Sequence, residues 1–171
     1  MSSIRPAAVA GSFYPGEAAA LAAEVASYLS EAKSPAVRPP KAIIAPHAGY
    51  IYSGPIAASI YARLVPLRGR IRRVVLAGPA HRVYVPGIAV PSTSGFASPL
   101  GEVALDRKAI DSLRAFPFVQ LSDRAHAYEH SLEVHIPFLQ SVLGSFSLVP
   151  LVVGDAAPGE MAQVLDALWG G

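Results

Sequence analysis

The chain has 171 residues, of which 52% are hydrophobic and only 15% are charged, so it is apolar enough to bury a core and unlike a disordered chain. Its net charge is +2 with scattered basic residues, and no apolar run is long enough to cross a bilayer. Cysteine is absent, which excludes disulfides and thiolate ligands within the chain. We expect a cytoplasmic protein that binds neither nucleic acid nor membrane. The lack of asparagine weakly favours a thermophilic source.

The first third of the chain predicts an extended lead-in, a helix and a linker. Residues 1–16 contain two prolines, and Phe13 and Tyr14 are expected to anchor them in the core. Residues 17–32 are rich in alanine and place apolar side chains at helical spacing, which predicts a helix. The proline-rich residues 34–40 are expected to end it as a linker.

A strand–helix–strand unit is predicted next. Residues 41–45 form an apolar run that predicts a buried strand, and a helix is expected over 54–65 with Pro55 in its first turn. A second buried strand is predicted over 72–77, and the arginines before it are expected to form a solvated loop. Strands joined by a helix in this way are expected to be parallel, with a right-handed crossover.

The rest of the chain alternates short strands with helices, which is typical of a sheet covered on both faces. We expect one α/β domain over 1–171: a three-layer sandwich with a mainly parallel or mixed sheet. The predicted strands are 83–85, 88–90, 103–105, 118–121 and 147–153, and the predicted helices are 106–116 (capped by Asp106), 126–143 (mostly helical) and 158–169.

Two histidines follow two of the predicted strands in the same way. His47 comes directly after Pro46, and His81 comes two residues after Pro79. Ligands bind outside the carboxyl ends of strands in open α/β sheets, where neighbouring strands lie about 4.8 Å apart, so both rings can meet. Each histidine alone is more simply a loop residue bonded to the backbone. The pair, however, favours a shared metal site of the kind that suits zinc, iron or copper.

The candidates for substrate binding are three residues that follow His47: Gly49, Tyr50 and Tyr52. Gly49 allows a ligand to approach the backbone closely. Tyr50 and Tyr52 offer hydroxyl groups to a substrate. The alternative, held equally, is that both tyrosines are amphipathic residues in the wall of the site.

A second polar group lies in residues 125–137, AHAYEHSLEVHIP, with three histidines and two glutamates. If this segment is helical, Glu129 and Glu133 share one face, as do His126 and His130. The segment lacks the HExxH order of zinc hydrolases. We expect a hydrogen-bonded wall in which Glu129 and His130 are the candidate catalytic residues. Glu129 or Glu133 is expected to orient a ligating histidine.

Four blocks of the sequence occur in this order: RPAAVAGSFYPG, IIAPHAGYIYSG, GPAH and EHSLEVHIPFL. Together they closely resemble the Memo family, called AmmeMemoRadiSam system protein B in microbes. The resemblance implies a fold similar to the catalytic subunit of class III extradiol dioxygenases. It also implies iron (Fe²⁺) or copper bound by His47 and His81. A third ligand in a CG motif and a base in an SSDxxH motif are implied further on, so we expect the domain to be incomplete at its carboxyl end.

Two functions therefore compete. The first is a Memo-family metal-site protein, related to non-haem iron dioxygenases, with redox chemistry on an unknown small molecule. The second is a non-catalytic module that binds a small-molecule or peptide ligand beside His47, Tyr50 and Tyr52. A dinucleotide enzyme and a serine hydrolase are disfavoured, because their glycine and GxSxG motifs are absent. Self-association into a homo-oligomer is left open by the sequence.

Overall fold

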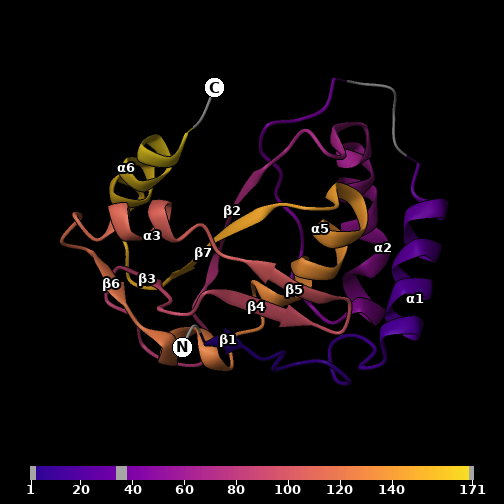
Figure 1. The fold of residues 1–171 in the computed structure, drawn as a ribbon, viewed down its shortest axis with the longest axis horizontal. Helices are drawn as coiled ribbons and strands as arrows, with labels where there is room; N and C mark the ends of the chain where they lie inside the picture. Colours follow the sequence, from indigo (N-terminus) through magenta and orange to yellow (C-terminus); the bar gives the residue numbers. More distant parts are fainter. Residues whose placement is uncertain (1–2, 34–37, 170–171) are drawn as a thin grey trace.

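Helices lie on both sides of a four-stranded mixed sheet in the computed structural model, which describes residues 3–33 and 38–169 (Figure 1). In the strand order β2-β7-β3-β6, β7 is parallel to β2 and antiparallel to β3, and β3 is parallel to β6. The α/β class and the mixed sheet predicted from the sequence are thus confirmed. These strands are β2 Arg73–Pro79, β3 Ile88–Val90, β6 Val119–Leu121 and β7 Ser147–Val153.

A second sheet has three strands in the order β1-β4-β5, with β1 parallel to β4 and β4 antiparallel to β5. It ties the start of the chain to residues almost a hundred positions later. The sequence did not predict β1 or β4, because both lie in segments rich in turn residues. The strands are β1 Ile4–Arg5, β4 Gly95–Ser98 and β5 Gly101–Ala104.

The helices form two groups (Figure 1). On one side α3 contacts α6 and β7, and on the other side α1 packs against α2 and α5. Among the described residues, no helix is long and apolar enough to cross a membrane. The helices are α1 Ala18–Glu31, α2 Tyr50–Tyr61, α3 Arg107–Leu113, α4 Asp123–Ala127, α5 Ile136–Leu143 and α6 Pro158–Leu168, with short 3₁₀ helices η1 Ala62–Leu67 and η2 Glu133–His135.

Several elements form where the sequence predicted them, for identifiable reasons. The Asp106 side chain accepts a hydrogen bond of 3.0 Å from the amide of Ala109 and so caps α3. The apolar run of β7 is the centre of the core, and Leu148 and Leu151 are fully buried. Of the predicted linker, residues 34–37 lie outside the described part of the chain.

The strand predicted at 41–45 is wrong. Among the described residues, none forms a backbone hydrogen bond with residues 42–46. The side chains do alternate as in a strand, because Ile43 packs against the core while Ile44 is 95% exposed. What is missing is a neighbour, since β2 pairs with β7 and not with this segment. The predicted parallel pair of 41–45 with 72–77 therefore does not form, and β2 is half-exposed instead of buried.

Two helix boundaries also differ from the prediction. Helix α2 begins at Tyr50, with Gly49 as its N-cap, so Pro55 lies inside it and not in its first turn. The Tyr50 ring is buried against Tyr14 and Phe138, which fixes this early start in the core. Residues 83–85 form no strand. The long helix predicted over 126–143 is interrupted at 128–132.

Candidate metal centre

Three histidines from distant parts of the sequence meet in one cluster. His47, His81 and His130 each place one ring nitrogen within 4.8 Å of the others. The ring centroids lie 5.3 Å apart for His47 and His81, 4.6 Å for His81 and His130, and 5.9 Å for His47 and His130. The structure thus brings the two predicted ligands together and adds His130, which the sequence placed beside the site as a catalytic candidate.

The interruption between α4 and η2 positions His130. The Glu129 side chain accepts hydrogen bonds of 2.9 Å from the backbone amides of His130 and Ser131. A carboxylate that bonds nearby amides competes with helical hydrogen bonding, which explains why the predicted helix stops here. The break turns the His130 ring toward the cluster. It also separates Glu129 from Glu133, so the prediction that they share a helix face is wrong.

The same carboxylate holds His81 in place. Glu129 Oε2 accepts from the His81 amide at 2.6 Å, and Glu129 Oε1 lies 2.9 Å from the His81 Nδ1 atom. A buried carboxylate beside Nδ1 favours a proton on that nitrogen and leaves Nε2 free to bind a metal. Glu129 therefore lies where a residue that orients a metal ligand is expected.

Glu129 stays ionised in this environment. Its side chain is only 2% exposed, and burial acts to raise its pKa. The hydrogen bonds from the His81 side chain and from the backbone of Ser131 and His81 outweigh burial and lower the pKa of Glu129 to about 2. The cluster thus contains a permanent negative charge behind the imidazole of His81.

The other two rings are neutral at pH 7. Burial, with a smaller contribution from the neighbouring His81, lowers the pKa of His47. Burial is also the largest cause of the lowered pKa of His130. Metal ions bind unprotonated imidazole, so both rings are in the state that a metal requires.

His130 has an unused nitrogen at this point. Its Nδ1 atom is buried and makes no hydrogen bond, although Glu129 Oε1 lies 3.4 Å away. One side of the ring contacts Phe13, with centroids 4.6 Å apart. An unpaired buried nitrogen costs free energy unless a ligand or water satisfies it, so this atom points to a missing partner.

The donor set fits a transition-metal ion. Nitrogens bound to one tetrahedral metal lie about 3.4 Å apart when each bond is about 2.05 Å, so modest side-chain rotations suffice to bring the three atoms together. Imidazole suits zinc, iron and copper. Three protein ligands also leave a coordination position for a substrate or water, as catalytic metal sites do.

The three predicted substrate-binding residues differ in their exposure and in their place in the fold. Tyr52 is 80% exposed on α2, and Gly49 is the cap that begins this helix. Tyr50 is only 2% exposed, and its hydroxyl donates to the carbonyl oxygen of Val134 at 2.8 Å. The Tyr50 ring thus lies in the core against Tyr14 and Phe138, and its hydroxyl is bonded to the backbone.

The remaining polar residues of the predicted wall lie in the core and not in the cluster. His126 Nε2 lies 3.1 Å from the carbonyl oxygen of Ala89. The Glu133 carboxylate, fully buried, receives hydrogen bonds from Arg5 and Tyr14, both at 2.6 Å. The sequence placed Phe13 and Tyr14 in the core but did not predict that Glu133 would fasten the lead-in. The signal available in the sequence was a charged residue, Arg5, within a mainly apolar lead-in.

Together, a mixed sheet between helices and a three-histidine cluster beyond the end of β2 define an α/β protein with a candidate metal centre. The chain belongs to the Memo-like family, because the family model described as Memo-like protein matches residues 5–169. This family was the one that the sequence blocks resembled.

Curated relatives agree with this assignment. A MEMO1 family protein of Ignicoccus hospitalis is 42% identical over 176 residues, covering 96% of this chain and 61% of the relative. One of Sulfolobus acidocaldarius is 35% identical, covering 97% of this chain and 63% of the relative. The protein memo-1 homolog of Caenorhabditis elegans is 36% identical, covering 93% and 45%. The chain thus spans about half to two thirds of the length of these relatives.

Proposed function

We propose that the histidine cluster binds iron or copper and that the chain takes part in redox chemistry with dioxygen on a small organic substrate. The observation that carries the proposal is the convergence of three ring nitrogens, one from each histidine, within 4.8 Å of one another, beside a His130 ring whose buried Nδ1 makes no hydrogen bond. A ring nitrogen without a hydrogen-bond partner is what a metal site without its ion is expected to contain.

Each residue has a defined part in the proposal. His47, His81 and His130 hold the ion, and Glu129 keeps the His81 ring in one tautomer and one orientation. These residues would hold iron or copper, which, when bound, would supply redox chemistry with dioxygen. The exposed Tyr52, five residues after His47, is the proposed contact for a polar group of the substrate.

Metal binding is tested first, independently of activity. The purified chain is stripped with a chelator, reloaded with Fe²⁺, Cu²⁺ or Zn²⁺, and its metal content and affinity are measured. We expect about one ion per chain, and at least about a hundredfold loss of affinity in a His47→Ala/His81→Ala variant, because a single imidazole remains. His126→Gln is the matched control, since this histidine lies outside the cluster. An unchanged ion content in the double variant would refute the proposed site.

Redox chemistry needs a second measurement. Oxygen uptake by the iron-loaded chain is followed with ascorbate as the electron donor, and compared with the double variant at the same total iron. We expect faster uptake with the intact cluster. Equal rates would show that the protein binds metal without promoting the reaction, and they would favour the alternative of a ligand-binding module.

A further inference from the structure

The outer edge of β2 carries backbone groups without partners. The carbonyl oxygen of Arg72 accepts from the first residue of β7, and the amide of Ala80 donates to the last residue of β7. Successive residues of a strand direct their backbone groups to opposite sides, so the even-numbered residues of β2 face β7. Val75 and Ala77 therefore direct their N–H and C=O groups outward, where the described residues provide no strand.

This edge is open along most of its length. Not one of the seven residues of β2 is buried, whereas five of the seven in its partner β7 are. Proteins protect edge strands with charges, prolines or bulges, because a bare edge pairs readily with another strand. In β2 these devices stand only at the two ends, as Arg73 and Pro79. The middle of the strand is left free to pair.

A second unpaired segment leads to the same place. Residues 42–46 belong to no helix or strand and make no backbone hydrogen bond with any described residue. His47 follows this segment directly, and His81 follows β2. Because the two rings lie 5.3 Å apart, the two unpaired stretches of backbone converge on the histidine cluster. A strand added at β2 would therefore end beside the candidate metal centre.

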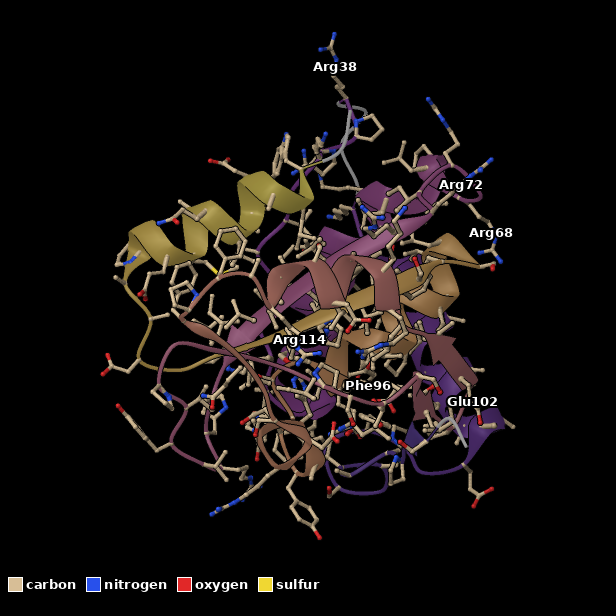
Figure 2. The ribbon with its side chains drawn as sticks, turned by 60° about the vertical axis from the view of Figure 1, so that its left-hand side comes forward. Arg38, Arg68, Arg72, Phe96, Glu102 and Arg114 are labelled. Carbon is tan, nitrogen blue, oxygen red and sulfur yellow. The ribbon has the colours of Figure 1, made fainter. Side chains whose placement is uncertain are left out.

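The stretch of sequence that contains β2 carries charged residues of one sign. Residues 32–101 contain no aspartate or glutamate. Figure 2 shows Arg68 and Arg72 projecting outward at the end where β2 begins. Asp106, from a later part of the chain, pairs with Arg73 at 2.7 Å. The basic residues of this stretch number nine: Lys33, Arg38, Lys41, Arg63, Arg68, Arg70, Arg72, Arg73 and Arg82.

We propose that the outer edge of β2 binds an extended, acidic polypeptide strand of another protein. Main-chain hydrogen bonds to Val75 and Ala77 provide the pairing, and acidic side chains complement Arg68 and Arg72 at the end where β2 begins. A second copy of this chain is a poor occupant, because two edges of the same positive charge repel each other. The inference does not depend on the proposed metal chemistry.

The test uses two synthetic peptides and one edge variant. Both peptides alternate Val and Thr, and they differ only in flanking glutamates or flanking lysines. Binding to the full chain is followed by amide chemical shifts. We expect the glutamate peptide to shift the amides of β2 and to bind about tenfold tighter than the lysine peptide, with the difference shrinking at high salt.

Ala77→Pro removes one outward N–H and leaves the bonds to β7 intact, because Ala77 faces away from β7 and is exposed. We expect this variant to lose at least about tenfold in affinity for the glutamate peptide. The control Ala77→Val keeps the amide and is expected to bind like the native chain. Equal binding of both peptides, or unchanged binding by folded Ala77→Pro, would overturn the proposal. So would a dimer that Ala77→Pro dissociates, since that would make a second copy the occupant.

Discussion

Replacing Glu129 tests whether the three histidines form a metal centre or only lie near one another. Its Oε1 atom accepts from the amides of His130 and Ser131 and lies beside His81 Nδ1, and its Oε2 atom accepts from the His81 amide. In Glu129→Gln the new NH₂ group must face at least one of these donors, whichever way the amide turns. The variant therefore loses an acceptor as well as the negative charge behind His81.

The expected result is a loss of about 10–100-fold in metal affinity, the usual effect of removing a partner of a ligating histidine. This corresponds to about 1.4–2.8 kcal/mol of binding free energy. Affinity for Zn²⁺ is measured by competition with a chelating dye, and the His81 tautomer is followed by ¹⁵N NMR. Glu102→Gln, on an exposed glutamate, is the matched control.

An affinity within about threefold of the native chain, with the fold intact by circular dichroism, would contradict the assignment of Glu129 as a positioning residue. So would a loss of affinity without any change in the His81 tautomer, because a purely structural role would not act through that ring. A Glu129→Asp variant keeps the negative charge but has a shorter side chain, so its metal affinity is expected to lie between those of the native chain and Glu129→Gln.

Three predictions concern stability. Glu133→Ala should lower the free energy of unfolding by about 3–5 kcal/mol in urea titrations, because Arg5 is left buried without its anionic partner, whereas Glu102→Ala should change it by less than about 0.5 kcal/mol. Asp106→Ala should cost about 1 kcal/mol at pH 7 by loss of the α3 cap. Because the pKa of Asp106 is lowered, mainly by the hydrogen bond from the Ala109 amide, this deficit should shrink as the pH falls below about 4. Burial lowers the pKa of His126 to about 4. Between about pH 6.5 and pH 4 this histidine is therefore protonated in the unfolded chain but neutral in the folded chain. Stability should therefore fall on acidification, by about 2 kcal/mol from this residue at pH 5, and His126→Gln should flatten that slope.

The sequence predicted the elements whose formation depends on local pattern and cap chemistry. β7 and α6 lie where apolar runs and capping residues placed them, and α3 begins after Asp106 as expected. For residues 41–45 the pattern matched only the alternation of the side chains, with Ile43 packed against the core and Ile44 exposed, because no strand forms there. It failed on pairing, because a strand is defined by a neighbour that the pattern of one segment does not encode.

The site was half predicted for a similar reason. The matching positions of His47 and His81 after two apolar runs were enough to predict that the two rings lie close together, and their centroids are 5.3 Å apart. The third histidine depended on a break in a helix, and that break depends on one side chain, Glu129, bonding the two amides that follow it. Helical spacing in the sequence predicted an unbroken face, since it carries no information on this competition.

The metal centre and the open edge of β2 are physically related. The segment that leads to His47 makes no backbone hydrogen bond with the described residues, and β2, which leads to His81, pairs with a described strand on one side only. Glu129 compensates for this at His81, where it bonds both the ring and the amide, but the described residues give the His47 ring no such bond. A strand bound at β2 would therefore be expected to order His47 more than His81. Metal affinity should then rise when the edge is occupied, and Ala77→Pro should abolish that increase without changing the affinity of the isolated chain.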